Sequence, residues 1–227
     1  MSGRSVIVTG GFGVLGRVVA AAFAEKGDRV ARIDFAPESM DAGPNMIDLA
    51  GVDLSDPVAA SAAVERVKEE LGGIDVLVNI AGGFTWETLS DGSPDSWRRM
   101  YAMNVLTAVT MTKAALPALV GAKGGRIINI GAGAAIKADM GMGAYAASKA
   151  GIHRFTEALA AELAGRDVTV NAILPSIIDT PTNRKDMPDA DFGSWVQPQA
   201  VADVVLFLAS PQARSIHGAL IPVTRGA

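Results

Sequence analysis

The 227-residue sequence contains no cysteine and only two histidines, His153 and His217. Without cysteine the chain has no disulfide, no thiolate metal site and no cysteine nucleophile. Two histidines are also too few for a multi-histidine metal cluster, so we expect no metal. The charges nearly balance, with 20 basic and 24 acidic residues. Such a surface has no general attraction for phosphate backbones or anionic lipids, so we expect neither nucleic acid nor a membrane as a partner.

Long apolar segments and targeting signals are also missing. The longest run without a charged residue is 13 residues, 100–112, which is shorter than the ~18 that indicate a membrane span. Arg4 is followed by a glycine-rich segment instead of the apolar core of a secretory signal. Hydrophobic residues make up 49% of the chain and charged residues 19%, which is typical of a folded domain. We therefore expect a soluble, cytoplasmic protein.

Short β-branched runs alternate with longer helical patterns. Parallel strands need crossover helices, so this alternation predicts one doubly wound α/β domain over residues 1–227, with a seven-stranded parallel sheet and helices on both faces. The predicted strands are 6–8, 30–33, 46–47, 76–78, 127–130, 168–170 and 220–223. The predicted helices are 18–26, 58–71, 97–119, 145–164 and 199–209. Residues 175–198 lack periodicity, which in a compact domain predicts a functional lid over a substrate.

A glycine-rich segment at residues 9–16 follows the first predicted strand and opens the first helix. Glycines there permit a tight turn and close approach of the backbone to a pyrophosphate, although such turns also occur only to reverse the chain. Asp34 ends the second strand 18 residues after Gly16, near the spacing of about 20 at which an acid binds ribose hydroxyls. The alternative for Asp34 is a solvated carboxylate, and Arg32 is expected to face solvent. Together the motifs predict a dinucleotide-binding (Rossmann) site that prefers NAD(H), because Asp34 repels the 2′-phosphate of NADP(H).

Tyr145 and Lys149 lie four residues apart at the start of a predicted helix, so their side chains share one face. A neighbouring ammonium stabilises a phenolate and lowers the pKa of a tyrosine from its usual ~10. Tyr145 is then a candidate general acid for reduction and a general base for the reverse reaction. The isolated pattern is common on protein surfaces, but its position after the fifth strand of a dinucleotide-binding sheet favours catalysis.

These motifs together resemble the short-chain dehydrogenase/reductase family over nearly the whole chain. The resemblance implies that residues 79–82 lie beside the cofactor and that Lys149 also binds the nicotinamide ribose. It implies that Asn104 holds a proton-relay water near Lys149; the alternative is a buried amide with no catalytic role. It further implies that residues 175–180 close over the nicotinamide. The implied NAD-binding residues are Gly10, Phe12, Gly13, Val14, Leu15, Gly16, Asp34, Asp53, Leu54, Asn79, Ala81, Gly82, Tyr145, Lys149, Pro175, Ile178 and Thr180.

The sequence departs from the family pattern at two positions. The catalytic serine of the family lies 13 residues before the tyrosine, and here that position is Ala132. Losing one donor to a developing oxyanion costs ~10²–10³ in rate. Val14 also takes the place of a glycine. Both departures, together with residues 179–195, resemble the quinonoid dihydropteridine reductase branch of the family, which implies an electron-poor quinonoid substrate.

Three aromatic residues, Phe84, Trp86 and Trp195, are candidates to stack on a flat substrate near Ala132. The alternative is that they pack at the edge of the core or at a subunit contact. His153 lies two turns after Tyr145, and we expect it at the surface or at an interface.

The leading hypothesis is an NAD(H)-dependent oxidoreductase that transfers hydride between the nicotinamide and a small carbonyl, alcohol or quinonoid substrate. Its catalytic residues are Tyr145, Lys149 and Asn104. The alternative is a non-catalytic dinucleotide sensor or scaffold that has lost the serine. Helices 97–119 and 145–164 carry more small and apolar residues than one core face requires. The family resemblance implies that these helices pair copies of the chain into a homodimer or homotetramer.

Overall fold

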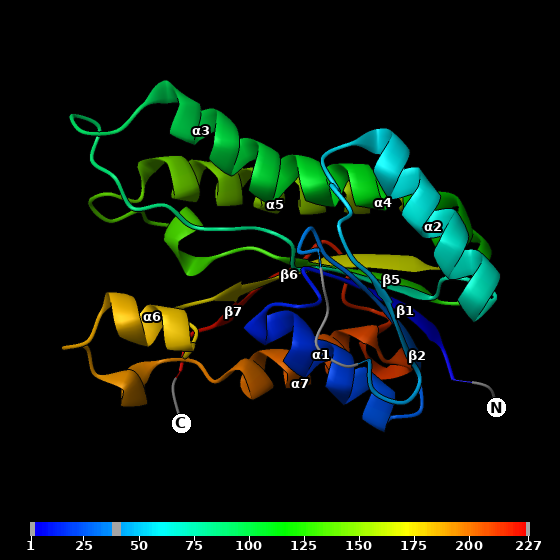
Figure 1. The fold of residues 1–227 in the computed structure, drawn as a ribbon. Coiled ribbons are helices and arrows are strands. Elements are labelled where there is room, and N and C mark those ends of the chain that lie inside the picture. Colours follow the sequence, from blue (N-terminus) through cyan, green and yellow to red (C-terminus); the bar gives the residue numbers. More distant parts are fainter. Residues whose placement is uncertain (1–2, 38–41, 226–227) are drawn as a thin grey trace.

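The computed structural model of the chain describes residues 3–37 and 42–225. Within these residues seven parallel strands form one sheet in the order β3-β2-β1-β4-β5-β6-β7, with helices on both faces (Figure 1). The predicted doubly wound fold is confirmed. The strands are β1 (Ser5–Thr9), β2 (Arg29–Ile33), β3 (Met46–Leu49), β4 (Val76–Asn79), β5 (Gly125–Ile130), β6 (Val168–Pro175) and β7 (Leu220–Val223).

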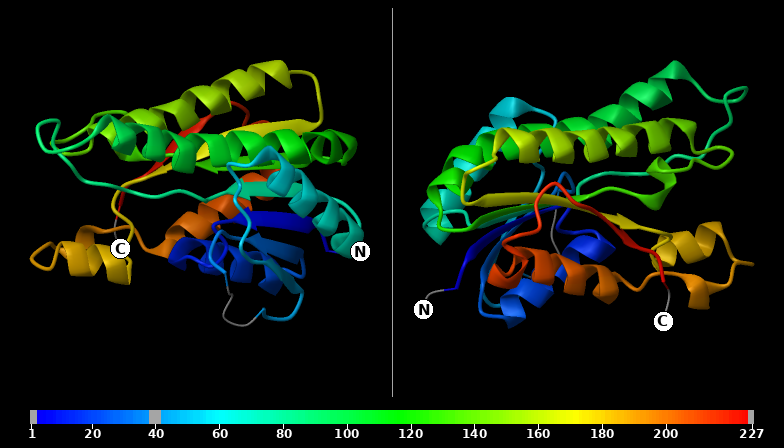
Figure 2. Two further views of the ribbon diagram at one scale, coloured as in Figure 1. Left: turned by 45° about the horizontal axis from the view of Figure 1, so that its top comes forward. Right: turned by 180° about the vertical axis from the view of Figure 1, so that it is seen from behind.

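The helices form one layer on each face of the sheet (Figures 1 and 2). One layer contains α1 (Val14–Glu25) and α7 (Pro198–Ala209). The other contains α2 (Pro57–Leu71), α3 (Pro94–Tyr101), α4 (Thr107–Gly121) and α5 (Gly143–Glu162). The short helix α6 is Pro181–Asp186, the π-helix η1 is Ala102–Leu106, and the 3-10 turns are η2 (Gly133–Ala135), η3 (Phe192–Ser194) and η4 (Pro211–Ala213).

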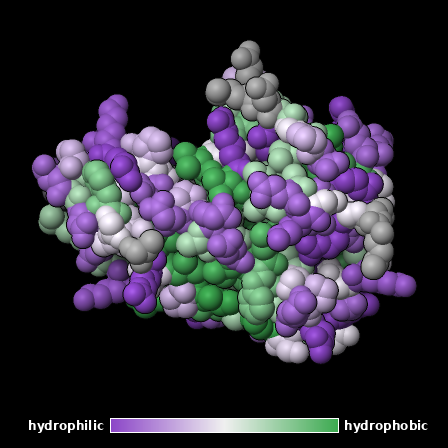
Figure 3. Space-filling model, turned by 90° about the horizontal axis from the view of Figure 1, so that it is seen from below, coloured by the Kyte–Doolittle hydropathy of each residue, from purple (hydrophilic) through white to green (hydrophobic). Residues whose placement is uncertain are grey.

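Alternate residues of each strand enter the two layers, because side chains in a strand alternate between its faces. Val6 and Val8 of β1 belong to the core on the α1 and α7 side, whereas Ile7 belongs to the core on the α2 and α4 side. All three are fully buried, and each such side chain stabilises the fold by about 1.5–3 kcal/mol. The outer face of α1 and α7 carries an apolar area bordered by polar side chains (Figure 3).

Capping side chains decide where the helices begin. The Asp56 carboxylate accepts a hydrogen bond from the N–H of Val58 at 2.9 Å, so α2 starts at Pro57. In the same way Ser93 caps α3, which begins three residues earlier than the predicted residue 97. Thr180 caps α6, a helix inside the segment predicted to be irregular.

The predicted helix 97–119 is a continuous helical segment, Pro94–Gly121, that contains the π-helix η1. By length and composition alone, this segment is the one in the described part of the chain that could cross a membrane. Its apolar residues Met111, Ala115 and Leu119 are fully buried in the core beneath α4. They therefore serve the packing of the domain.

The sheet order reverses direction between β1 and β4. In open α/β sheets, ligands bind at such a switch point, beyond the carboxyl ends of the strands. The turn after β1 and the loop after β4 meet there, because the Thr9 hydroxyl accepts hydrogen bonds from the N–H groups of Ile80 at 3.0 Å and Ala81 at 3.1 Å.

Candidate active site

The turn between β1 and α1 requires its glycines. Gly10 has a φ of +63°, and a Cβ there would lie 2.9 Å from the backbone nitrogen of Ala81. A Cβ on Gly16 would lie 2.1 Å from the carbonyl oxygen of Gly10. Side chains at these positions would therefore push the turn apart from the helix and from the loop after β4. With glycine at both positions, the turn packs closely against α1 and against the loop after β4. No side chain of the turn then covers the N–H groups at the N-terminus of α1, which can bind an anion.

A cavity of about 920 Å³ opens over this turn, a size typical of sites for small molecules and cofactors. The predicted cofactor residues that line it are Gly10, Phe12, Gly13, Val14, Leu15, Gly16, Asp34, Asp53, Leu54, Ala81, Gly82 and Thr180. The sequence reasoning missed further lining residues, among them Arg17, Phe35, Val52, Ile80, Arg99 and Thr107. Arg17 and Phe35 directly follow predicted residues and could have been inferred. Arg99 and Thr107 come from the helical segment over the site, whose packing no local pattern reveals.

Asp34 is held at the cavity by the backbone. Its carboxylate accepts hydrogen bonds from the N–H of Phe12 at 2.9 Å and from the N–H of Ala36 at 3.1 Å. A carboxylate has about four acceptor sites, so acceptor capacity remains for ribose hydroxyls. The glycine cradle, the cavity and this oriented carboxylate fit an adenine dinucleotide.

The expectation that Arg32 faces solvent is wrong. Arg32 is buried and forms an ion pair with Asp48 on β3, the residue directly opposite it in the sheet register. Its guanidinium carbon also lies 5.6 Å from the ring centroid of Phe12. A single sequence did not reveal this partner, because Asp48 becomes a neighbour only when β2 and β3 pair.

Asn79 does not line the cavity, contrary to the prediction. Its side-chain amide donates to the Thr112 hydroxyl at 3.0 Å and to the Asn129 carbonyl oxygen at 2.8 Å. The amide of Asn129 in turn donates to the hydroxyl of Thr156 at 2.9 Å. This buried network ties β4 and β5 to α4 and α5, so Asn79 supports the sheet beneath the site.

The lid segment contacts the cavity through α6. Thr180 and Thr182 line the cavity. Pro175 instead ends β6, and Ile178 forms an isolated bridge with Val196. Neither Pro175 nor Ile178 lines the cavity, so the structure does not place these two predicted cofactor residues there.

The lid has its own small packing unit. Asp179 forms an ion pair with Arg184 at 2.6 Å and accepts a hydrogen bond from Gln197 at 3.0 Å, and its pKa is lowered to about 2, chiefly by the Arg184 bond. Trp195 is only 4% exposed and its ring centroid lies 4.8 Å from that of Phe192. Trp195 therefore packs inside the lid instead of offering a face to a substrate, which corrects the stacking prediction.

The side chain of Lys149 is buried at the carboxyl end of β5. Its ammonium donates to the carbonyl oxygen of Ile130 at 2.8 Å, and burial lowers the pKa of Lys149 to about 8. This is its one hydrogen bond to the described residues, so two of its three N–H donors remain for a ligand. Neither Lys149 nor Tyr145 is among the residues that line the cavity over the glycine turn, so the predicted contact of Lys149 with a ribose stays a prediction.

Burial raises the pKa of Tyr145 to about 12. The expectation of a lowered pKa is not borne out, because the ammonium of Lys149 is bonded to a backbone carbonyl and desolvation is the cause that acts on the phenol. Among the described residues the Tyr145 hydroxyl has no hydrogen-bond partner. The phenol is thus held protonated and ready to donate.

Asn104 lies in η1 and its side chain is fully engaged by the protein. Its amide donates to the carbonyl oxygen of Gly83 and to the Ser148 hydroxyl, both at 3.0 Å, and its oxygen accepts from the N–H of Gly83. The hydroxyl of Ser148 donates to the carbonyl oxygen of Tyr145 at 2.7 Å. The side chain of Asn104 therefore matches the buried-amide alternative. The Ser148 hydroxyl is already bonded to Asn104 and to the Tyr145 carbonyl, so Ser148 does not replace the missing serine.

Ala132 is buried, and its N–H donates to Nε2 of His153 at 3.5 Å. His153 is 4% exposed, so its expected surface position is wrong. A Cβ on Gly131 would lie 2.7 Å from Nε2 of His153, so the ring occupies the space behind the end of β5. Burial lowers the pKa of His153, which keeps the imidazole neutral and able to accept. Neither the methyl nor the N–H of Ala132 offers a donor to a substrate.

Phe84 is the candidate aromatic residue that the structure brings to Tyr145. The two ring centroids lie 4.9 Å apart in an edge-to-face arrangement. Trp86 instead covers Gly141 and donates from Nε1 to the carbonyl oxygen of Met140 at 3.1 Å. A wall made of all three predicted aromatic residues therefore does not form.

Comparison with known proteins gives consistent results. A family model described as short chain dehydrogenase matches residues 4–191. The chain is 30% identical over 242 residues to the 3-oxoacyl-(acyl-carrier-protein) reductase FabG of Thermotoga maritima, covering 100% of the chain and 98% of the relative. It is 33% identical over 237 residues to the meso-2,3-butanediol dehydrogenase of Serratia marcescens, covering 99% and 94%. The solved structure of ligand-free aldohexose dehydrogenase from Thermoplasma acidophilum is similar, with a TM-score of 0.88, 28% identity, and coverage of 97% of this chain and 92% of that one. These relatives lend no support to the likeness of residues 179–195 to dihydropteridine reductase.

Proposed function

Because the chain belongs to the short-chain dehydrogenase family, we propose that it is an NAD(H)-dependent oxidoreductase acting on a small carbonyl, alcohol or quinonoid compound. One observation carries the proposal: Asp34 is oriented at the cavity over the glycine turn, while Lys149, on the helix face that it shares with Tyr145, makes a single hydrogen bond to the described part of the chain. A sensor that only binds a dinucleotide has no chemical need for a buried lysine beside a tyrosine.

Tyr145 is the proton donor in this proposal. When bound, the nicotinamide supplies or accepts the hydride. With a pKa raised to about 12, the phenol is protonated at neutral pH and gives its proton to the substrate atom that gains negative charge. Lys149, with a pKa lowered to about 8, is charged at neutral pH, holds the ribose hydroxyls and stabilises the phenolate that remains.

A proton relay through Asn104 must use its main chain, because its side chain is fully engaged. In η1 the N–H of Thr107 bonds the carbonyl of Ala102, five residues back. In an ordinary α-helix each carbonyl accepts a hydrogen bond from the N–H four residues later, and the π-type bond interrupts this pattern. We propose that a carbonyl of this segment holds the relay water.

The missing serine points to the substrate class. Ala132 supplies no hydrogen-bond donor to the substrate atom that accepts the proton. The substrate must therefore react with the Tyr145 phenol as the one donor that stabilises the charge developing on that atom. A quinonoid ring is electron-poor and regains conjugation when it takes hydride. Quinonoid dihydropterin is therefore the first substrate to test, supported by the resemblance of residues 179–195. The names of the relatives indicate the competing class, ketones and secondary alcohols.

The direct test is turnover with purified protein. NADH oxidation is measured with quinonoid dihydropterin and with a 3-oxoacyl thioester, and NAD reduction with meso-2,3-butanediol and an aldohexose. We expect turnover in this panel, with NADH favoured over NADPH because of Asp34. Tyr145→Phe should abolish turnover and leave NADH binding unchanged. Binding of NADH without turnover of any substrate would favour the sensor and refute the proposal.

We also propose that the enzyme is a homo-oligomer that pairs through the helical layer formed by Pro94–Gly121 and α5. These helices lie side by side on one face of the sheet (Figure 2), and Tyr101 and Leu106 are 50% and 39% exposed. Large exposed apolar side chains are typical of interaction sites. Light scattering should give a dimer or tetramer, and Leu106→Glu should shift it toward monomer. A monomeric wild-type protein would contradict this proposal.

A further inference from the structure

We propose that Asp48 sets the cofactor preference of this site from a distance, by holding the Arg32 guanidinium away from Asp34. The inference rests on the proposed preference for NADH. Asp48 does not line the cavity, so it acts as a positioning residue. Its influence passes through Arg32 and Phe12 to the carboxylate that faces the ribose.

The ion pair between β2 and β3 is tightly built. The sheet register sets Arg32 directly opposite Asp48, and the guanidinium donates from Nε at 2.7 Å and from Nη2 at 2.6 Å to the two carboxylate oxygens. The side chains are only 5% and 12% exposed. A two-pronged, charge-assisted pair of this kind holds a guanidinium in one place. Removing the acid takes away two charge-assisted hydrogen bonds from this buried cation, which strengthens its attraction to the other anions around it.

Asp34 is an anion within reach of Arg32. The two residues are separated by one position in an extended segment, so their side chains emerge on the same side, about 6–7 Å apart along the chain. Arg32 and Asp34 also share Phe12 as a neighbour. The Arg32 guanidinium carbon lies 5.6 Å from the centroid of the Phe12 ring, and the backbone N–H of Phe12 donates to the Asp34 carboxylate at 2.9 Å. Asp48 and Asp34 therefore compete for one guanidinium.

The outcome of this competition decides the charge at the ribose. While Asp48 holds Arg32, the charge of Asp34 is not compensated by this guanidinium, so its carboxylate accepts from ribose hydroxyls and repels a 2′-phosphate. If the guanidinium moves to Asp34, it neutralises the carboxylate and offers donors to a 2′-phosphate. Loss of the Asp48 charge should thus relax discrimination against NADPH.

The test measures binding of NADH and NADPH by isothermal titration calorimetry, so it does not depend on knowing the substrate. In Asp48→Asn the ratio of the NADPH Kd to the NADH Kd should fall about tenfold, which is about 1.4 kcal/mol. In the double variant Asp48→Asn/Arg32→Leu the ratio should return to within about twofold of wild type, because the mobile cation is gone. AMP and adenosine 2′,5′-bisphosphate should repeat this pattern without the nicotinamide.

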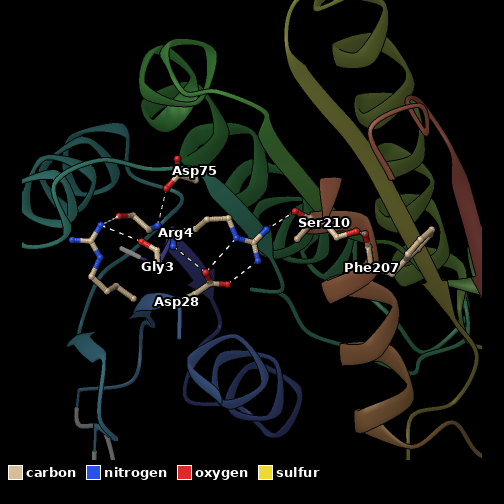
Figure 4. A network of polar contacts seen from close by, with 9 residues as sticks. Gly3, Arg4, Asp28, Asp75, Phe207 and Ser210 are labelled. Atoms are coloured by element: carbon tan, nitrogen blue, oxygen red, sulfur yellow. Dashed lines mark hydrogen bonds and ion pairs between the residues drawn. The ribbon is translucent and has the colours of Figure 1, made fainter. Parts of the chain in front are cut away.

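A matched control exists at the opposite end of the sheet. Arg4 precedes β1 and binds Asp28 through Nε at 3.3 Å and Nη2 at 2.7 Å, and the Asp28 side chain is 6% exposed (Figure 4). Asp28→Asn breaks another two-pronged arginine–aspartate pair, in which Asp28 is buried and Arg4 is 34% exposed, far from the carboxyl ends of the strands. It should lower the unfolding temperature yet leave the ratio of the two Kd values unchanged.

Three results would overturn the inference: an unchanged ratio in folded Asp48→Asn, an equal change in Asp28→Asn, or a relaxed ratio that persists in the double variant. If Asp48→Asn does not fold, Asp48→Thr provides the same test, because a β-branched residue suits the edge strand β3. A wild-type protein that binds NADPH more tightly than NADH would instead refute the proposed cofactor preference. The effect of the Asp48 substitution on the ratio would still be measured separately.

Discussion

Replacing Lys149 with methionine should abolish turnover and yet relieve a cost to folding. The ammonium is buried at the end of β5 with one backbone partner, and burial lowers the pKa of Lys149 from 10.5 to about 8. A lowered lysine pKa means that the folded state disfavours the proton relative to the unfolded state. The buried charge of Lys149 therefore lowers stability, as is common for groups whose charge serves the binding and catalysis that we propose here.

The size and the sign of this cost follow from the two pKa values. Below pH 8 both states bind the proton, and the folded state carries the full penalty, about 3 kcal/mol for a lysine pKa that falls from 10.5 to about 8. Between pH 8 and pH 10.5 the folded state releases the proton first, so stability rises with pH. At pH 10 about 1 kcal/mol of the penalty remains. The variant has a similar volume but no titratable group, and it loses the hydrogen bond to Ile130 at both pH values.

The assay is urea unfolding of wild type and Lys149→Met at pH 7 and at pH 10. The stability of the variant relative to wild type should be about 2 kcal/mol more favourable at pH 7 than at pH 10. Groups that titrate in both proteins cancel in this comparison, and so does the lost hydrogen bond. A difference in stability that stays the same at both pH values would refute the reasoning, because burial would then not have shifted the pKa of Lys149.

Three further substitutions test the site and its support. Gly16→Ala should abolish NADH binding, measured by calorimetry, because its Cβ would lie 2.1 Å from the Gly10 carbonyl oxygen; unchanged affinity would refute the close packing of the turn. Ala132→Ser should raise kcat for a ketone more than for a quinonoid substrate, by about tenfold or more, since it restores a donor; equal effects on the two classes would contradict the proposed role of Ala132. His217→Ala should lower the free energy of unfolding by about 2 kcal/mol, measured in urea, because the imidazole joins α5 and β6 through main-chain hydrogen bonds of 2.7 Å and 3.2 Å.

Cavity-lining residues that lie close together in the sequence were predictable. The glycine turn and Asp34 depend on local geometry: a strand, a turn whose backbone only glycine permits, a helix and a second strand. Such elements bring their residues together whatever the rest of the chain does. Arg99 and Thr107 were not predictable in this way, because they reach the cavity only when a helical segment from elsewhere in the chain packs over it.

Roles of buried polar residues were not predictable, since each depends on a partner distant in the sequence. Arg32 is paired with Asp48 across two strands, Asn79 bonds Asn129 fifty residues away, and His153 packs behind Ala132. Trp195 is buried by the lid's own fold. A pattern shows which residue types are present, but it does not show which of them neutralise or cover one another.

The amino-acid sequence by itself determined the doubly wound sheet, the place of the dinucleotide turn and the family, because strand and helix periodicity and turn chemistry are local properties. Only the tertiary structure decided the electrostatics of the site. In the folded chain Lys149 donates to the Ile130 carbonyl, and burial raises the pKa of the Tyr145 phenol. Asp34 faces the cavity, while Arg32 forms its ion pair with Asp48. Desolvation and pairing of charges depend on every element packed around a group, and they arise only when the sheet and its helices have assembled.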